Sequence, residues 1–267
     1  SLVQENGEIY IFSDHEISNS IKEYFIENNI RHFSINKIEE FFKNRNFKRT
    51  IFDFKTTPFE LANIIFKYSN DYRNLSNPCN LLKACKNKTE IEGAIKAHIR
   101  DGVALTKFLF WLDSKSENNK LNEIDVEEKL LDLRKNEESF ISPSFNTIAG
   151  TGSNGAIVHY KANKANCKKL KAGDLLLVDS GGQYLDGTTD VTRTIALFPN
   201  EQKIQKEKKD RFTRVLKGHI AIACSVFKKG TIGKDLDPFA RKYLIEEGLD
   251  YKHGTGHGVG SFLGVHE

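Results

Sequence analysis

Two kinds of hydrophobic spacing alternate over roughly the first 75 residues of the chain. Residues 8–12 (EIYIF) and 48–54 (KRTIFDF) are short runs of β-branched and aromatic residues, which are typical of strands. Residues 15–29 and 58–69 carry apolar residues at helical spacing. Strands that alternate with helices predict a small α/β unit at the start of the chain.

The pattern changes at residues 76–80, SNPCN, which interrupt the helical spacing with proline and small polar residues. This segment is the candidate linker. We therefore expect one domain over residues 1–78 and a second over residues 79–267.

Helical spacing opens the second part. Thr89 stands three residues before Glu92, a capping-box pattern that predicts the start of a long helix. Its predicted buried stripe consists of Ile91, Ile95, Ile99, Leu105, Phe108, Leu109 and Leu112. A second helix is predicted from near Asn122, and two more are predicted at about 203–229 and 236–247.

Strand patterns dominate from Phe140 onward, between the second and third predicted helices. Four segments have this character: FNTIAGTG (145–152), AIVHY (156–160), DLLLVDSGG (174–182) and TTDVTRTIALF (188–198). Helices followed by antiparallel strands around one core predict an α+β class for this part.

Composition and charge exclude several classes of protein. With 39% hydrophobic and 28% charged residues, the chain reads as globular rather than disordered. Its net charge of +4 is small, and its lysines are interspersed with glutamates, so we expect no nucleic-acid partner. No stretch approaches the roughly 18 consecutive apolar residues of a membrane helix, and the first residues do not resemble a signal peptide. The four cysteines, which fall in no paired metal spacing, are then reduced thiols of a cytoplasmic protein: Cys79, Cys85, Cys167 and Cys224.

Two aspartates stand out among the strand residues. Asp179 ends an apolar strand, and Asp190 lies between threonines on the next predicted strand. If the two strands pair as a hairpin, both carboxylates point into one space, where a cation would neutralise them. Such hard oxygen ligands suit Mn or Mg, with Zn and Co as alternatives. The competing interpretations are two solvated turn acids, or one buried acid paired with Arg193; Asp186 is interpreted as a turn residue.

The last fifteen residues, 253–267 (HGTGHGVGSFLGVHE), combine three histidines with five glycines. Glycine lets the backbone approach a bound group closely, and histidine is a common metal ligand and proton shuttle. The spacing of His253 and His257 would put both on one side of an extended segment, and His266 is far enough along to return on an adjacent strand. His159 ends the predicted strand at 156–160. The remaining histidines are assigned structural roles: His15, His32, His98 and His219.

Three segments carry a resemblance to a known family: GTGSNGAIVHY, LLLVDSGGQYLDGTTDVTRTI and HGTGHGVGSFLGVHE. From about residue 81 to the end, the chain resembles the catalytic domain of aminopeptidase P (Xaa-Pro aminopeptidase), most closely the cytosolic, eukaryotic-like branch. The resemblance implies a pita-bread fold, as in creatinase and methionine aminopeptidase. It also implies that the first 80 residues are part of the α/β domain that precedes the catalytic one, and that the chain is truncated at both ends.

The resemblance also implies a site and an activity. Asp179 would hold one metal, Asp190 would bridge two, and His257 would hold the second. Three histidines would line the pocket and handle protons, the scissile carbonyl and the proline ring: His159, His253 and His266. The metals are usually Mn, with Zn or Co as alternatives, and two such ions can share a hydroxide that attacks the carbonyl before proline. The substrate is a peptide with proline in second position, and a homodimer is a family expectation.

One departure from the family weakens the expectation of peptidase activity for the 267 residues by themselves. The family's remaining two ligands are glutamates on later strands, and Glu267 should point away from His266 rather than replace them. We therefore expect a C-terminally incomplete pita-bread domain that is inactive or weak alone. A non-catalytic pita-bread module that binds peptides or proteins is the alternative. Methionine aminopeptidase is disfavoured by the SFLGVHE segment and the α/β leader.

Overall fold

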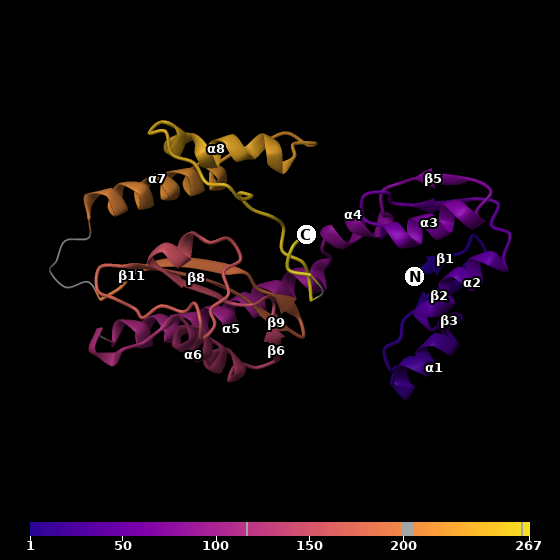
Figure 1. Cartoon of the computed structure of the whole chain (residues 1–267), viewed down its shortest axis with the longest axis horizontal. Coiled ribbons are helices and arrows are strands. Elements are labelled where there is room, and N and C mark those ends of the chain that lie inside the picture. Colours follow the sequence, from indigo (N-terminus) through magenta and orange to yellow (C-terminus); the bar gives the residue numbers. More distant parts are fainter. Residues whose placement is uncertain (116, 199–204, 263) are drawn as a thin grey trace. The chain divides into compact units, whose positions relative to one another are not determined.

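In the computed structural model, the chain folds into two compact units, Ser1–Leu82 and Lys83–Glu267 (Figure 1). The division falls inside the short helix α4, Pro78–Ala84, so the predicted linker contains the start of a helix. The residues that the structure describes are 1–115, 117–198, 205–262 and 264–267.

The first unit alternates strands and helices. Its elements are β1 (Leu2–Val3), β2 (Ile9–Phe12), α1 (Asn19–Glu27), β3 (Ile30–Phe33), η1 (Ile35–Lys37), α2 (Ile38–Lys43), β4 (Thr50–Phe52), α3 (Phe59–Tyr68) and β5 (Tyr72–Asn74). The pairs β2–β3 and β4–β5 are parallel, and each is joined through a helix, as expected of an α/β unit. Its core is built around Tyr10, Phe41, Phe42 and Ile65.

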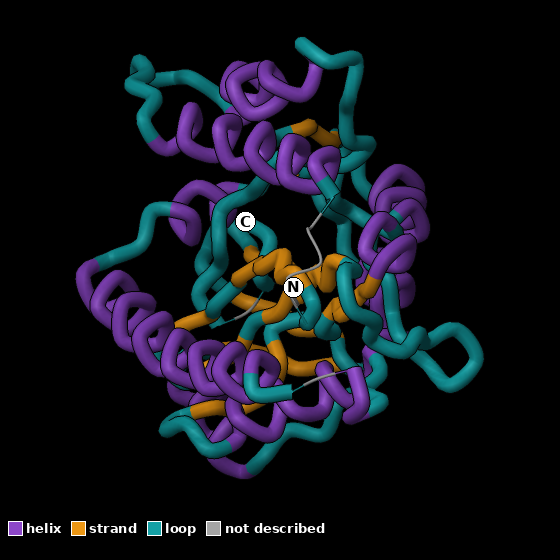
Figure 2. The backbone as a smooth tube through the Cα atoms, turned by 90° about the vertical axis from the view of Figure 1, so that its left-hand side faces the viewer, coloured by secondary structure: helices purple, strands orange, loops and turns teal. Residues whose placement is uncertain are grey.

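The second unit packs two antiparallel sheets against helices. Its elements are α5 (Lys88–Asp113), η2 (Glu117–Asn119), α6 (Glu123–Lys135), β6 (Phe140–Pro143), β7 (Ile148–Thr151), η3 (Gly152–Ala156), β8 (Leu175–Ser180), β9 (Gly182–Tyr184), β10 (Gly187–Thr188), β11 (Val191–Ala196), α7 (Lys206–Ala223) and α8 (Gly233–Ile245). The sheet orders are β11-β8-β7 and β10-β9-β6. The strands lie between α5 and α6 on one side and the α7–α8 pair on the other (Figures 1 and 2).

The long helix α5 begins two residues earlier than its sequence pattern predicts. Asn87 caps it, with Glu90 completing the capping box, instead of Thr89 and Glu92. An asparagine is as good a cap as a threonine, so the two overlapping patterns could not be separated from sequence.

The buried face of α5 also differs from the predicted stripe. Leu105, Phe108 and Leu112 are buried, whereas Ile91, Ile95 and Ile99 are exposed. The first half of the helix turns small residues inward because the backbone of the turn between β9 and β10 lies against it. A Cβ on Gly93 would lie 2.0 Å from the Asp186 carbonyl oxygen, which leaves no room for a large side chain.

The last two helices differ from their predicted ranges: α7 is shorter, and α8 is shifted toward the N-terminus. α7 covers residues 206–223 of the predicted 203–229, of which 203 and 204 lie outside the described residues. α8 begins three residues before its predicted start, at Gly233. Among the described residues, no helix has both the length and the apolar character needed to cross a membrane.

A buried ion pair links α5, α6 and β9. The Nε and Nη2 of Arg134 donate to the two carboxylate oxygens of Asp101 at 2.7 and 2.9 Å, and both side chains are almost fully buried. The Tyr184 hydroxyl donates to the same carboxylate at 2.9 Å. Burial, followed by the Asp101 carboxylate, raises the pKa of Tyr184. This network fixes how the two helices meet the smaller sheet.

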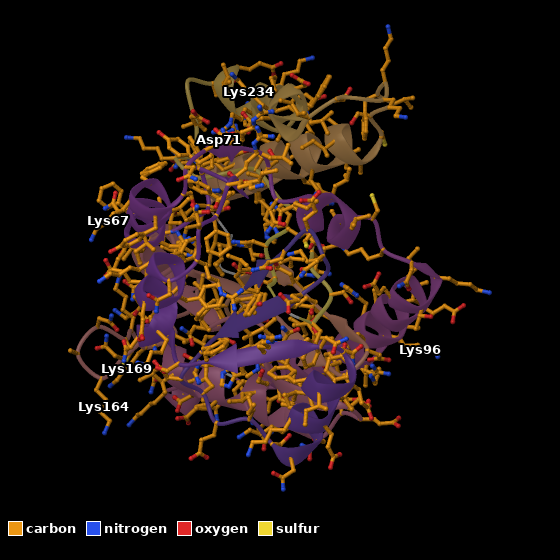
Figure 3. The ribbon with its side chains drawn as sticks, turned by 90° about the vertical axis from the view of Figure 1, so that its right-hand side faces the viewer. Lys67, Asp71, Lys96, Lys164, Lys169 and Lys234 are labelled. Carbon is orange, nitrogen blue, oxygen red and sulfur yellow. The ribbon has the colours of Figure 1, made fainter. Side chains whose placement is uncertain are left out.

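The surface lysines come from separate elements. Those labelled in Figure 3 stand on α3 (Lys67), α5 (Lys96), α8 (Lys234) and in the loop after η3 (Lys164 and Lys169). This scatter matches the interspersed charge of the sequence.

Candidate functional site

Asp179 lies on one face of the β11-β8-β7 sheet, and Asp190 lies just before β11. Along β8, Leu176 and Val178 point into the core, so Asp179 points to the opposite face. Thr192 pairs with Asp179 across the sheet, and its hydroxyl donates to Asp179 Oδ1 at 2.8 Å. Asp190 lies two residues before Thr192, close enough for its charge to act on the Asp179 carboxylate.

Asp190 is not on a strand, in contrast to its predicted position. The segment TTDVTRTI splits into β10 and β11, which belong to different sheets, and Thr189 and Asp190 form the crossover between them. The chain makes a matching crossover at Gly181, between β8 and β9. A Cβ on Gly181 would lie 1.9 Å from the Thr189 carbonyl oxygen, so glycine lets the two crossovers touch.

The surroundings of Asp179 disfavour the charged form of its carboxyl group. Burial raises the pKa of Asp179, and the negative charge of Asp190 raises it further. The hydrogen bond from Thr192 and the imidazoles of His159 and His257 act in the opposite direction. The net effect is an increase, as expected of a carboxylate with a second carboxylate beside it.

The C-terminal residues fold back on themselves and bring two histidines together. Val259 and His266 form an antiparallel bridge, and Gly258 and Glu267 exchange two backbone hydrogen bonds of 2.9 Å. The rings of His257 and His266 then lie 4.1 Å apart. The described residues between His257 and His266 return antiparallel through an isolated bridge, not through a pair of strands.

This folded segment reaches the carboxylates. His257 Nε2 lies 3.1 Å from Asp190 Oδ2. Arg193, the competing partner from sequence, instead donates to the Thr192 carbonyl. The Asp190 side chain is mostly buried, which excludes the interpretation of a solvated turn acid.

Glu267 is engaged by two lysines. Its carboxylate pairs with Lys83 at 2.9 Å and with Lys86, and its side chain is nearly buried. The ammonium groups of Lys86 and Lys83 hold the pKa of Glu267 below its usual range. The side chain is thus occupied by partners other than the histidines.

His159 does not end a strand, which corrects the strand predicted at residues 156–160. The helix η3 and a turn occupy this stretch, and His159 is exposed with a φ of 57°. The reason is not local, because AIVHY has good strand propensity. The side chains of Asn154 and Tyr160 both turn inward to bind Glu123, which draws the chain into a loop.

Glu123 is a residue that sequence analysis missed. It is the first residue of α6 and is fully buried. Its carboxylate accepts hydrogen bonds from Thr151 N (2.7 Å), Tyr160 Oη (2.7 Å), Lys168 N (2.9 Å) and Asn154 Nδ2 (3.0 Å). Burial and the Glu123 carboxylate raise the pKa of the Tyr160 hydroxyl. No local pattern marks this role, since a glutamate in a first helical turn is usually solvated.

His253 differs from His257 in the partners of its ring, although the Nδ1 of each lies near the carbonyl of the next residue. Its ring stacks on Tyr251 at 4.6 Å, and its Nδ1 lies 2.8 Å from the Gly254 carbonyl. The backbone from Gly254 to Gly258 is irregular. Among the described contacts, His257 alone of these two pairs with a carboxylate.

The donors of the site suit divalent cations. Two carboxylates and an imidazole are the ligand types that Mn, Zn and Co accept. Among the described residues, no three such side chains already stand in the geometry of a metal site. Each carboxylate instead has a protein partner, His257 for Asp190 and Thr192 for Asp179. The fit to a divalent metal rests on the types of donor, two carboxylates and an imidazole.

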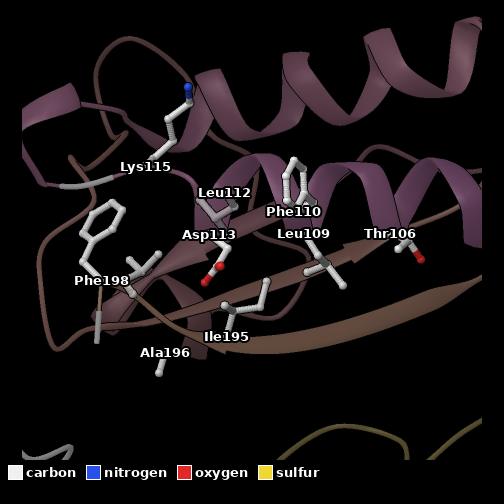
Figure 4. A pocket seen from close by; sticks show the side chains of 10 residues that line it. Thr106, Leu109, Phe110, Leu112, Asp113, Lys115, Ile195, Ala196 and Phe198 are labelled. Carbon is white, nitrogen blue, oxygen red and sulfur yellow. The ribbon is translucent and has the colours of Figure 1, made fainter. Parts of the chain in front are cut away.

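A pocket of the second unit lies away from these residues. It has a volume of about 430 Å³ and lies between the end of α5 and β11 (Figure 4). It is lined by Thr106, Leu109, Phe110, Leu112, Asp113, Lys115, Ile195, Ala196, Leu197 and Phe198. None of the six candidate site residues lines it.

The raised pKa of Asp179 predicts how metal-free protein responds to pH. The ordinary pKa of this carboxyl group is 3.8, and its pKa in the folded protein is higher. At pH values between the two, the carboxyl group is more often protonated in the folded chain than in the unfolded chain. Rising pH therefore destabilises the metal-free fold through this group. In chelator-treated protein, Asp179→Asn is expected to raise the thermal unfolding midpoint at neutral pH. The gain should vanish at about pH 3, and an equal gain at both pH values would contradict the expectation.

Comparison with known proteins also indicates a metal-dependent enzyme family. The sequence profile of metallopeptidase family M24 matches residues 92–267. A probable Xaa-Pro aminopeptidase P of Paracoccidioides brasiliensis is 49% identical over 201 residues, covering 74% of this chain and 32% of that protein. A similar protein of Arthroderma gypseum is 50% identical over 193 residues, covering 72% and 30%. The chain thus spans about a third of the length of the curated relatives it matches.

Solved structures agree. An X-prolyl aminopeptidase of Caenorhabditis elegans, described as a cytosolic enzyme with a di-nuclear active site, matches with a TM-score of 0.84 and 32% identity. It covers 97% of this chain, which in turn covers 43% of the worm protein. These likenesses confirm the predicted pita-bread fold and its relation to aminopeptidase P. The chain belongs to metallopeptidase family M24.

Proposed function

We propose that this chain supplies the aspartates and histidines of a dinuclear metal site, in a protein that removes the first residue from peptides with proline in second position. The observation that carries the proposal is the contact of His257 with Asp190, beside Asp179. It lies within a chain about half identical to probable Xaa-Pro aminopeptidases. The proposal needs both the contact and the sequence similarity.

Three side chains hold the metals in this proposal. Asp179 would hold one ion, His257 would hold the second, and Asp190 would be shared by both. Divalent cations bound there lower the pKa of water and polarise a carbonyl group. We propose Mn, with Zn or Co as alternatives that the same donors accept.

The other three histidines act on the peptide. His266 stands against His257 and is placed to donate a hydrogen bond to an oxyanion as charge develops there. His159 faces the charge of Asp179 and holds or releases a proton at its ring. His253 lies on the glycine-rich segment and is assigned to the wall that receives the proline ring. Proline has no N–H and a fixed φ, so a shaped pocket replaces the strand-like pairing used for ordinary peptides.

We further propose that the 267 residues alone bind metal weakly and turn over little or no peptide, because three donors are few for two ions. A cytoplasmic location and a homodimer remain proposals. The partner of the site is the peptide substrate.

Two measurements test the proposal. Metal content is determined by mass spectrometry, and release of the first residue from an X-Pro peptide is followed with added Mn. Both are applied to this chain and to the longest chain that its genome encodes around these residues, called here the parent protein. Near-stoichiometric metal and X-Pro cleavage by the parent protein are expected.

The alternative gives a different result. The direct pairing of His257 with Asp190 also suits a module that binds peptides without metal. If the parent protein holds no metal, cleaves no X-Pro peptide and still binds one, this module replaces the peptidase.

A further inference from the structure

The glycine-rich segment before His257 has little order of its own. Among the described residues, those from Lys252 to His257 make no backbone-to-backbone hydrogen bond. Added Cβ atoms on Gly254 and Gly256 would meet nothing within 4 Å. These glycines therefore do not serve a close contact, and their effect is to increase the freedom of the chain. Something outside the segment must hold it in place.

One arginine on α8 binds the start of this segment. Arg241 Nη1 donates to the Tyr251 carbonyl at 2.6 Å, and its Nη2 donates to the His253 carbonyl at 2.9 Å. Its Nε pairs with Asp237 at 2.8 Å, and its Nη1 also pairs with Asp250 at 2.7 Å. The guanidinium carbon lies 4.0 Å from the centre of the Tyr251 ring.

A second side chain of α8, Asp237, also binds the glycine-rich segment. The Thr255 hydroxyl donates to Asp237, one helical turn before Arg241, and lies 2.6 Å from the Tyr251 hydroxyl. Residues 251, 253 and 255 are therefore all held by two side chains of α8. Beyond them, the bridge between Val259 and His266 holds the other end.

We propose that Arg241 is a positioning residue, which fixes the glycine-rich backbone so that His253 and His257 are presented in one arrangement. The effect on catalysis rests on the proposed function, whereas the effect on the backbone does not. Lysine cannot replace this arginine, because only the planar guanidinium reaches two carbonyls and two carboxylates at once.

The neighbouring helix offers a matched control. Arg214 on α7 pairs with Asp210 and Glu247 and donates to the Tyr243 carbonyl. Its side chain is 19% exposed, against 17% for Arg241. It stabilises the same helix pair without touching the glycine-rich segment.

Limited trypsin digestion tests the backbone effect, because Lys252 lies between the two carbonyls that Arg241 binds. Cleavage after Lys252 requires this stretch to open locally, and its rate follows the open population. In the 267-residue chain without metal, Arg241→Lys and Arg241→Ala are expected to speed this cleavage about tenfold, from the loss of charge-assisted hydrogen bonds. Arg214→Ala should leave the rate within about twofold of the unaltered chain.

A kinetic measurement on the parent protein tests the consequence. Arg241→Lys is expected to lower kcat for an X-Pro peptide about tenfold with KM changed less than about twofold, as for a displaced catalytic group. An unchanged cleavage rate after Lys252 in both Arg241 variants overturns the proposal, as does equal acceleration by Arg214→Ala. If Arg241→Ala does not fold, the lysine variant decides. If the parent protein is not a peptidase, the trypsin result still decides.

Discussion

Asp190→Asn is expected to abolish X-Pro cleavage by the parent protein and to weaken Mn binding by about a hundredfold or more, since even changes beside metal ligands cost roughly 10- to 100-fold. Asp190 contacts the imidazole of His257, and its charge also acts on Asp179. An amide keeps the size of the side chain but removes the charge that holds the imidazole and the cations. No other described carboxylate contacts His257.

Titration calorimetry with Mn and a peptide-release assay measure this effect. Asp186→Asn is the matched control, because Asp186 lies in the same β9–β11 stretch but pairs with Arg100 instead of a histidine. The control should keep both metal binding and turnover. Retention of Mn affinity within about tenfold by Asp190→Asn would remove the basis for the dinuclear site.

Asp101→Asn is expected to lower the free energy of unfolding by about 3–5 kcal/mol. Arg134 would remain buried with its charge unpaired, and the Tyr184 hydroxyl would lose its anionic acceptor. Breaking one side of a buried pair costs more than the pair contributes, because the remaining charge cannot reach water.

Urea unfolding of the 267-residue chain measures this loss. Asp113→Asn, an exposed acid on the same helix, should change stability by less than about 0.5 kcal/mol. The double variant Asp101→Leu with Arg134→Met should recover much of the loss, since apolar side chains of similar volume can replace a buried pair. A loss under about 1 kcal/mol for Asp101→Asn would mean that the pair is not isolated from water.

The elements that the sequence predicted well are those determined by their own residues. The helix α6 begins at the predicted place, next to Asn122, whose side chain accepts hydrogen bonds from backbone N–H groups of the first turn. The apolar segments became β7, β8 and β11, paired in antiparallel order, because alternating or continuous apolar runs need a sheet to bury them. The order of the histidine and aspartate motifs was also enough to predict the family, which the comparisons confirm.

Other features depended on residues far away along the chain. The direction in which Ile91 points is decided by the Asp186 backbone against Gly93, and nothing in the helix itself reveals that neighbour. The loop that carries His159 follows from the buried carboxylate of Glu123. Local propensity cannot anticipate either, since burial and hydrogen-bond partners override it.

The sequence by itself therefore determined which side chains could bind a metal, because residue type and motif order are local properties. Only the tertiary structure decided that Asp190 lies at a crossover between two sheets and that His257 returns to meet it at 3.1 Å. It also decided that an arginine on α8 holds a segment whose glycines give it no order. Contacts between distant residues depend on how layers pack, and the free energy of that packing is shared over the whole unit.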